Sequence, residues 1–557
     1  MTEPQSPVNV PLQTFDDDDP RVVAKASTED YALHVAPHSW RSGRVSMMMA
    51  WYAFASAMFW LIVGATVAQV VGTVDTIIGL ALSVLAYSVI GGTLSRFAAR
   101  TGISSAMFSR ALFGYIGAAV APLIVGATAL YYAVFEGSVI AVVFHEYTGF
   151  GSIYLWYAIV AAYSIPLVIG GVRTWLDKLN GVLLPFYYVG LAVVVVWAIV
   201  RDGYSNDWLT APPATPDLDL HAPGWFFAFT TYMGVWIMMP FTWDFARLAR
   251  LRDDKLHRWL TFGPLFYVLT LVVNALVGIF LAHSIAAGGH LNELSAVSAM
   301  VGLAGIVGVA LVWVSQTRIN TANYYLASIN AESFFARLFR INLPRRIWVF
   351  VIGVAAFALM LTDATTYLLK ALQWQGVLVV AWVAVALVYL AFARRDGLTA
   401  QDFEFRAGRI PAFNGVGLVA WFGASALGIV LVQVGGSWGA TWSAPTTFVV
   451  AAVVYAIGRL ATGDRHVVLR RPHDPRDEVE DRWETRIRCA SCDLHYLAQE
   501  MDRNPATADH APICAECASN DHAYRRAAYA QARAFNSSGA HSPAVNESPS
   551  KATQHRS

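Results

Sequence analysis

The sequence is poor in charge and in cysteine. Only 14% of its 557 residues are Asp, Glu, Lys or Arg, whereas 56% are hydrophobic, and it has four cysteines. Soluble globular chains carry about 25% charged residues, so the composition excludes an ordinary soluble protein. The net charge of +1 gives no support to nucleic-acid binding. The first 45 residues lack a basic segment followed by an apolar one, so no cleavable signal peptide is expected.

Long apolar stretches fill the region between Met47 and Leu460. A membrane-spanning helix needs about 20 mostly apolar residues, because hydrocarbon offers no water to the backbone groups. We identify twelve such stretches and predict an all-α polytopic membrane protein. Their predicted bounds are 46–72, 75–96, 117–143, 153–172, 181–200, 224–243, 260–283, 298–328, 346–362, 366–392, 413–434 and 444–462.

Lys and Arg fall mostly in every second connection between these stretches. Five of them lie within residues 247–258, after the sixth stretch, whereas Arg201 and Lys370 are the exceptions on the opposite side. The positive-inside rule makes the basic side cytoplasmic, so we expect a multi-pass cell-membrane protein with both termini in the cytoplasm. The predicted parts are a cytoplasmic tail (1–45), a membrane domain (46–462), a linker (463–484), a cysteine-bearing module (485–522) and a disordered tail (523–557).

Two charged residues stand out inside the predicted spans. Glu136 is in the third span, one helical turn after Tyr132, and Arg318 is in the eighth. A charge at the centre of a span costs about 2.5 to 3.5 kcal/mol on insertion scales, so both are candidates for a functional site. The alternative is a structural network in which Glu136 and Arg318 form an ion pair that holds the bundle together. Further polar residues surround Arg318: Gln316, Thr317, Asn320, Thr321 and Asn323.

The sixth span carries Gly234 and Pro240 within an otherwise apolar stretch. Proline removes a backbone donor and clashes with the preceding turn, so the pattern predicts a broken or kinked helix. Broken helices expose backbone groups to ligands and ions and are typical of transporter binding sites. A simple kink without a ligand is the alternative.

Several motifs together point to a family. They are Glu29-Asp30-Tyr31, Thr101-Gly102-Ile103, Ser109-Arg110 with Phe113-Gly114, Gly234 to Trp236, Asp244-Phe245 with Arg247, Asn320 to Asn323, and Gln375-Gly376. Because these motifs occur in this order along the chain, the chain resembles the nucleobase-cation symporter family of purine, cytosine and allantoin permeases over residues 28 to 465. The resemblance implies the leucine-transporter fold: two inverted repeats of five helices, two further helices, and broken first and sixth spans. A break of the first span around Ala55 to Met58 is implied by the resemblance alone.

The resemblance also implies site residues. Trp236 corresponds to the aromatic residue that stacks on a flat heterocycle, and Tyr132 takes the place where members often carry Trp. Asn323, with Asn320 as the alternative, corresponds to the amide that binds the ring. Gly234 and Ser56, at the two expected breaks, complete the substrate-binding candidates. Ala129 stands where cytosine-type members have Gln, which argues against cytosine itself.

The coupling cation is expected to be H⁺ or Na⁺. Family members that use sodium bind it with first-span carbonyls and eighth-span hydroxyls, but Thr317, Arg318 and Thr321 do not supply two adjacent hydroxyls. A guanidinium beside a cation is repulsive, by about 4 kcal/mol at 4 Å with an effective dielectric of about 20. We therefore hypothesise that Arg318 takes the place of sodium and that Glu136 couples transport to protons.

The four cysteines are Cys489, Cys492, Cys514 and Cys517, in two Cys-x2-Cys pairs. Two such pairs can hold one Zn²⁺ with four thiolates, and the cytoplasmic location argues against disulfides, the competing interpretation. His495 and His510 are alternative ligands or bystanders. We expect a structural or protein-binding zinc-ribbon-like module; a redox or zinc-sensing role is the alternative.

The expected function is therefore a symporter that imports a nucleobase-like or ureide substrate, such as a purine, pyrimidine, allantoin or hydantoin. The competing hypothesis is a receptor that senses such a compound and signals through the zinc module to a cytoplasmic protein partner. No nucleophile and base pair and no phosphate-cradling glycine loop is recognisable, so we do not expect an enzyme.

Overall fold

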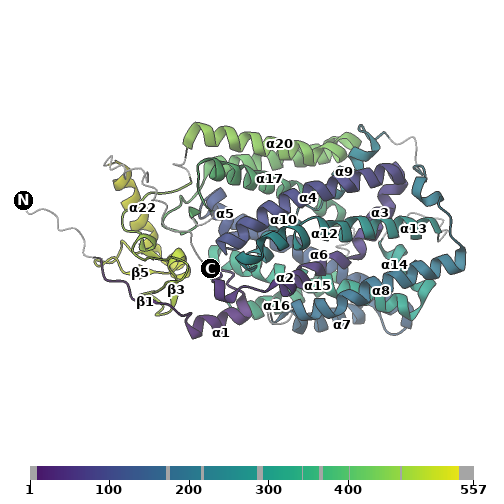
Figure 1. Cartoon of the computed structure of the whole chain (residues 1–557), viewed down its shortest axis with the longest axis horizontal. Coiled ribbons are helices and arrows are strands. Elements are labelled where there is room, and N and C mark those ends of the chain that lie inside the picture. Colours follow the sequence, from purple (N-terminus) through teal and green to yellow (C-terminus); the bar gives the residue numbers. More distant parts are fainter. Residues whose placement is uncertain are drawn as a thin grey trace, which may run out of the picture.

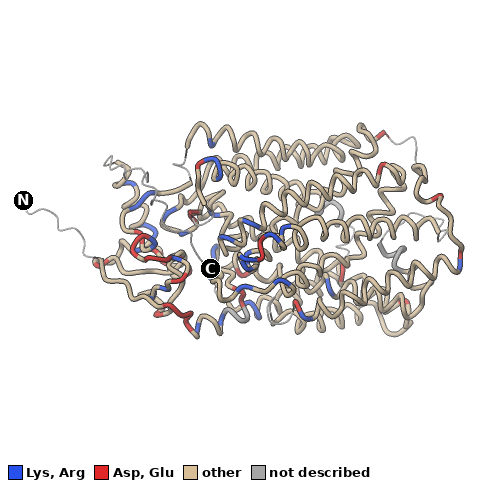
Figure 2. The backbone as a smooth tube through the Cα atoms, in the orientation of Figure 1, with Lys and Arg blue, Asp and Glu red and all other residues tan. Residues whose placement is uncertain are grey.

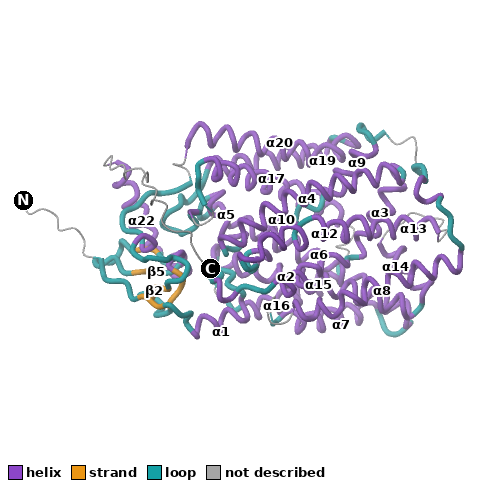
Figure 3. The backbone as a smooth tube through the Cα atoms, viewed as in Figure 1, coloured by secondary structure: helices purple, strands orange, loops and turns teal. Residues whose placement is uncertain are grey.

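The computed structural model describes residues 9–170, 176–214, 219–284, 293–341, 343–362, 368–399, 402–463 and 467–537. Helices aligned with the long axis of the molecule form a bundle, and a smaller body that holds the strands lies at one end (Figures 1 and 3). The fold is therefore a helical membrane bundle with an appended module.

The helices of the first half follow the predicted spans closely. Their bounds are α1 Pro20–Glu29, α2 Arg44–Trp51, α3 Met58–Val71, α4 Thr73–Thr101, α5 Ser105–Phe113, α6 Val120–Thr148, α7 Ile153–Val168, α8 Asp177–Asp202, α9 Gly224–Met233 and α10 Met238–Ala246. The second half contains α11 Asp254–Leu256, α12 Pro264–Tyr267, α13 Asn274–Ser284, α14 Glu293–Ala304, α15 Ile306–Leu338, α16 Arg345–Met360, α17 Leu368–Arg395, α18 Gly415–Leu418, α19 Ala424–Val434 and α20 Gly436–Thr462.

Seven helical segments of the described chain are long and apolar enough to cross a membrane, and the bent pair α2 and α3 makes an eighth. Four predicted spans fall outside this group. α7 and α16 have 16 residues each, the sixth span is divided between α9 and α10, and α15 is too polar along its length. The predicted helical membrane fold is confirmed, with interruptions in several spans.

The eighth span begins later than predicted. The sequence analysis started it at residue 298, but α14 ends at Ala304 and α15 begins at Ile306, with Gly305 between them at φ +53°. Glycine adopts this left-handed backbone without steric cost, so it separates the two helices. Residues 298–304 therefore belong to a separate helix.

α15 is the central helix of the bundle. It packs against α6, α7, α8, α14 and α16, and its polar residues from Ser315 to Asn323 are all buried. Burial inside protein explains how so polar a helix is tolerated at membrane depth, since its side chains meet other helices rather than lipid.

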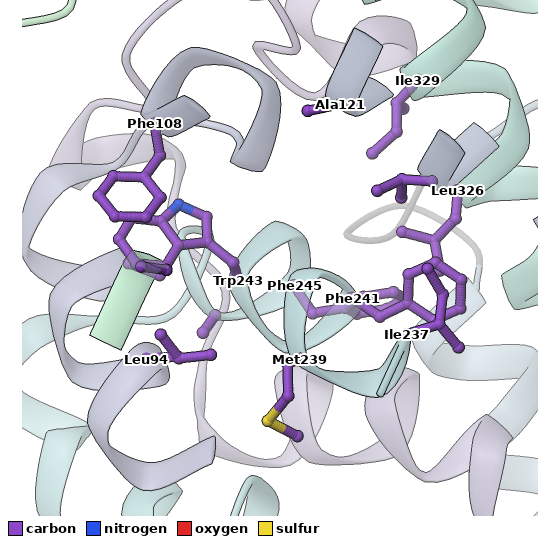
Figure 4. Packing of buried hydrophobic residues seen from close by; sticks show 14 of the residues in the cluster. Leu94, Phe108, Ala121, Ile237, Met239, Phe241, Trp243, Phe245, Leu326 and Ile329 are labelled. Carbon is purple, nitrogen blue, oxygen red and sulfur yellow. The ribbon is translucent and has the colours of Figure 1, made fainter. Parts of the chain in front are cut away.

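Aromatic packing fixes α10 in the bundle. Trp243 stacks on Phe108 of α5 with ring centroids 3.9 Å apart, and its indole Nε1 donates to the carbonyl of Ile103 at 3.0 Å (Figure 4). Met239, Phe241 and Phe245 of the same helix are also buried (Figure 4). The second half of the sixth span is therefore held rigidly against the connection between the second and third spans.

Both ends of the chain build the module. The strands are β1 Thr14–Phe15, β2 Arg486–Arg488, β3 His495–Leu497, β4 Asp502–Arg503 and β5 Pro512–Ile513. β2 pairs antiparallel with β1, placing Thr14 opposite Ile487, and with β3 on its other side, whereas β4 pairs with β5. Helices α21 (Ala515–Asn520) and α22 (His522–Ser537) follow.

The structure describes part of each tail and contradicts the disorder expected from residue 523 onward. Within the tail predicted over residues 1–45, β1 joins the module sheet. Residues 523–537 are not disordered but form most of α22, where Tyr524, Ala528 and Ala532 are buried along one face at a spacing of four residues. Residues 538–557 lie outside the described residues. The small size of these alanines hid the helical periodicity in the sequence.

Charged residues gather in the module and at the neighbouring end of the bundle, whereas the rest of the bundle is mostly uncharged (Figure 2). Residues of the predicted linker belong to this charged region. Arg406 donates to both Glu404 and Asp474 at 2.7 Å. Burial alone would raise the pKa of Glu404, but Arg406 and Arg476 lower it to about 2. Part of segment 463–484 is therefore a structured contact between module and bundle.

Candidate functional site

The first membrane helix is interrupted in its middle. α2 passes into a 3₁₀ turn over Tyr52–Ser56, Ala57 has an extended backbone (φ −60°, ψ 130°), and α3 begins at Met58 with a bend of 45°. The break implied by the family resemblance is present. It needs no glycine or proline, because side chains of α15 bind the backbone groups that the break leaves free.

The sixth span is also interrupted, as predicted. α9 ends at Met233, Gly234 caps it, and α10 begins at Met238. Pro240 is the third residue of α10, where backbone N–H groups have no partner within the helix. The interruption therefore precedes the proline. The first turn of the new helix accommodates Pro240, so the proline does not bend a continuous helix here.

A cavity of about 340 Å³, open solvent included, lies at the two interruptions. The sides are mostly apolar and aromatic, with Tyr132, Glu136 and Asn323 as the polar residues. The lining residues are Phe54, Ala57, Phe59 and Trp60 of the first span, Tyr132 and Glu136 of α6, Val235, Ile237, Met238 and Phe241 of the sixth span, and Ile319 and Asn323 of α15.

Two predicted substrate residues line this cavity, Tyr132 and Asn323. Asn323 is 1% exposed, and its Nδ2 has no partner among the described residues. Asn320 is equally buried, and neither of its amide atoms has a described partner, but it does not line the cavity. The Nδ2 atom of Asn320 is directed toward Gly137: a Cβ atom added to that glycine would lie 3.6 Å from it. A buried, unsatisfied amide is costly, so Asn323 is suited to a polar ligand.

The remaining substrate candidates lie beside the cavity. Trp236 packs between Phe448 of α20, at 5.7 Å between ring centroids, and Tyr87 of α4, at 6.2 Å, and it does not line the cavity. Gly234 is at the end of α9. Ser56 is fully buried at the first break, where its hydroxyl donates to the carbonyl of Ala53 at 3.1 Å. The stacking role of Trp236 stays a prediction.

Glu136 is linked to the first break through Gln316. The carboxylate of Glu136, 1% exposed, accepts a hydrogen bond from Gln316 Nε2, and Gln316 Oε1 accepts one from the backbone N–H of Met58 at 3.2 Å. The neighbouring Ser315 donates its hydroxyl to the carbonyl of Ser56. The cavity carboxylate and the backbone of the broken helix thus share one network.

Arg318 also contacts the first break. Its Nη2 donates to the carbonyl oxygen of Tyr52 at 2.8 Å, while Nε and Nη1 have no partner among the described residues. The side chain is fully buried. A positive charge therefore lies at a backbone carbonyl that the interruption exposes.

The other two coupling candidates bind protein groups. The hydroxyl of Thr317 lies 2.9 Å from that of Tyr163, and the hydroxyl of Thr321 donates to the carbonyl of Arg318 at 2.6 Å. Asn180 donates to Thr321 at 3.4 Å. Neither threonine lines the cavity.

The ion pair weighed as the structural alternative does not form. No salt bridge joins Glu136 to Arg318 in the described part of the chain, and Gln316 is the partner of Glu136 instead. Residues two positions apart on a helix point to different sides, so Gln316 and Arg318 cannot both face Glu136.

The four cysteines converge in the module. Their sulfur atoms lie within 4.8 Å of one another, and all four thiols are free. Tetrahedral Zn²⁺ with Zn–S bonds of about 2.3 Å needs sulfurs about 3.8 Å apart, so the group fits zinc. Backbone amides support it, since the N–H of Cys514 donates to Cys489 Sγ at 3.3 Å and that of Cys517 to Cys514 Sγ at 3.4 Å.

The two histidines have other partners. His495 stacks on Phe15 at 4.3 Å and lies 3.2 Å from a carboxylate oxygen of Asp19. His510 Nδ1 is 3.0 Å from the side-chain oxygen of Asn9. The set of four thiolate ligands is therefore complete without them.

Sequence reasoning missed some of the lining residues. Phe54 and Phe241 come from the two interrupted helices and lie 5.7 Å apart with their rings nearly parallel. In the sequence they look like ordinary core aromatics. Only their positions, within four residues of each break, could have singled them out.

Two interrupted helices around a central cavity define a membrane-helix bundle with a leucine-transporter-like fold. The fold is shared with Mhp1, described as a nucleobase-cation-symport-1 family transporter. Its closed form with bromovinylhydantoin bound matches with a TM-score of 0.60 and 16% identity, over 77% of this chain and 95% of that one. The inward-facing form of Mhp1 matches with a TM-score of 0.60 and 14% identity, over 76% and 93%.

A Na⁺-coupled sialic acid symporter matches with a TM-score of 0.58 and 11% identity, over 79% of this chain and 93% of that one. No family profile and no curated protein sequence matches the chain. The fold that the family resemblance implied is thus confirmed, and these proteins of the same fold are membrane transporters rather than enzymes.

Proposed function

We propose that this protein is a secondary active transporter that imports a small, planar nucleobase-like or ureide compound together with a cation. The observation that carries the proposal is the cavity between the two interrupted helices. Aromatic rings beside one carboxamide suit a flat, amide-rich ring, because stacking supplies burial and the amide supplies selectivity. Mhp1, which has the same fold, is described with bromovinylhydantoin bound.

In this proposal Tyr132 stacks on the ring and Asn323 binds its polar edge. Both side chains line the cavity. Trp236, Asn320, Gly234 and Ser56 support the site from behind the lining residues. Rocking of one group of helices against the other would open the cavity to each side of the membrane in turn.

For coupling, we propose that a proton on Glu136 accompanies the substrate. Arg318 already holds a positive charge at the carbonyl of Tyr52, so a sodium ion at that carbonyl would be repelled. Glu136 lines the cavity and reaches the first break through Gln316. Its protonation could therefore bias the conformation of the broken helix.

The zinc module and both described ends of the chain are proposed to be cytoplasmic. The support is the concentration of basic residues at the same end of the bundle (Figure 2). The group of four cysteines is proposed to hold structural Zn²⁺.

A receptor is the second candidate function, and the docked module favours it. Tyr115 donates its hydroxyl to the carbonyl of Ser519 at 2.9 Å, and the N–H of Val35 donates to Glu500 at 3.2 Å. Such contacts could pass the state of the bundle to a partner protein.

Uptake into proteoliposomes separates the two. Labelled uracil, hypoxanthine, allantoin and hydantoin would be offered with sodium and proton gradients imposed separately. We expect concentrative uptake of at least one compound under the proton gradient. Saturable binding without flux under either gradient would favour the receptor, and uptake that requires sodium and ignores the proton gradient would refute the assigned coupling.

A further inference from the structure

A cleft lies between the bundle and the module, away from the substrate cavity. It encloses about 300 Å³, open solvent included. The bundle contributes Arg110 of α5, Tyr115, and Ser333 and Arg337 of α15, and the module contributes Ser519 and Asn520 of α21. Neither the transport proposal nor the zinc site uses these residues.

Three arginines surround the ring of Tyr115. The guanidinium carbons of Arg337, Arg525 and Arg110 lie 4.9, 5.2 and 5.6 Å from its centre. Arg525 belongs to α22, so the cluster joins the module to the bundle. Cation–π contacts attract each guanidinium to the ring, but one neutral ring cannot neutralise three positive charges.

None of the three arginines forms a salt bridge with a carboxylate in the described part of the chain. Arg110 is 5% exposed; its Nη1 donates to the carbonyl of Phe405 at 3.4 Å, and its Nε has no partner among the described residues. The buried Nε of Arg525 also lacks a partner. Burial, reinforced by the positive charge of Arg337, lowers the pKa of Arg110.

The nearby carboxylates are already engaged. Glu516 lines the cleft but accepts from His34 at 2.9 Å and from Lys25 at 3.3 Å. Glu500 is bound to His34 and the N–H of Val35. The cleft therefore keeps an uncompensated positive charge, and a buried charge without a counter-ion costs several kcal/mol.

We propose that this cleft binds the phosphate group of an anionic ligand, which bridges the bundle and the zinc module. Arg110, which lines the cleft, and Arg525, which lies over the lining residue Tyr115, each have an unpartnered Nε–H, and Ser333 and Ser519 supply hydroxyls. Guanidinium groups match the geometry of phosphate oxygens. The phosphate group would belong either to a soluble phosphate compound or to the headgroup of an anionic lipid.

The test uses the full-length, zinc-loaded protein in nanodiscs and measures the thermal unfolding midpoint. In phosphatidylcholine discs, inorganic phosphate is compared with chloride at equal ionic strength; in a second arm, phosphatidylglycerol replaces part of the lipid and phosphate is omitted. A saturable rise with phosphate indicates a soluble source. A rise only with phosphatidylglycerol indicates a headgroup.

Arg110→Gln and Arg525→Gln should each weaken the response at least tenfold. The exposed Arg533→Gln on the same helix α22 is the matched control and should leave it unchanged. Zinc content and elution volume report whether each variant is folded, and Arg525→Lys, which keeps the charge, replaces Arg525→Gln if that variant loses zinc. No rise in either arm with the unaltered protein, or a rise that both Gln variants retain, would overturn the proposal. Because no transport is measured, failure here is separate from failure of the proposed function.

Discussion

At the scale of single residues, the polar side chains of α15 divide between two tasks. Gln316 joins Glu136 to the start of α3, and Arg318 binds the carbonyl of Tyr52. The sequence showed that this helix was too polar for lipid, and that inference holds. Which side chain meets which could not be derived, because partners depend on the rotation of α15 against α6.

Glu136→Gln should abolish uptake driven by a proton gradient while leaving substrate binding in place. Glutamine keeps an oxygen that can accept from Gln316, so the network is preserved but the proton is not exchanged. Glu146→Gln, an exposed change farther along the same helix, is the control and should leave uptake unaltered. Counterflow and proton uptake in proteoliposomes would be measured; proton-driven uptake that survives Glu136→Gln would place the coupling elsewhere.

Tyr132→Ala should raise the half-saturating substrate concentration by about ten- to a hundredfold, since stacking on a base is worth about 1 to 3 kcal/mol. Trp236→Ala should have a smaller effect, because that ring packs against Phe448 outside the cavity lining. Concentration-dependent uptake by the two variants decides between them. A larger rise in the half-saturating concentration for Trp236→Ala than for Tyr132→Ala would show that Trp236 is the residue that stacks on the substrate.

At the scale of elements, the presence of breaks in the first and sixth spans could be predicted, but the residues at which these spans break could not. Gly234 and Pro240 marked the sixth span, yet the break lies over Gly234–Ile237, before the proline. The first span breaks at Ala57 with no glycine or proline nearby. Local propensity cannot locate such a break, because bonds from α15 stabilise it.

The zinc module offers a test at the same scale. Removing the metal with a chelator, or changing Cys489 to Ser, should unfold residues 485–522, since zinc binding to such sites supplies about 10 to 16 kcal/mol. Metal content and limited proteolysis of the purified protein report the change. Ser491→Ala, between two of the ligands, is the control. A protease-resistant module in the metal-free protein would show that the fold does not depend on zinc.

The docking contacts predict how attachment of the module depends on pH. His34 is buried between Glu500 and Glu516; burial alone would lower its pKa, but the two carboxylates raise it from 6.5 to about 10. Its contribution is therefore fully present below pH 6.5 and is lost as the pH rises through about 10. Proteolytic release of the module should increase over this range. His34→Gln should flatten the dependence, and an identical pH profile in that variant would exclude His34 as its cause.

At the scale of the whole molecule, the alternation of basic connections predicted that both ends lie on one side. In the structure β1, near the beginning of the chain, pairs with β2, more than four hundred residues later, so both described ends lie at one end of the bundle. The joining of the two tails was not predictable, since strands of two and three residues leave no recognisable pattern in a sequence.

The pairing of β1 with β2 ties assembly of the module to the topology of the whole chain. Thr14 can meet Ile487 only when the two ends leave the bundle on the same face. A molecule with one crossing too few would keep its tails apart, with β2 lacking one neighbour in its sheet. Completion of the module therefore depends on an even number of membrane crossings between its two parts.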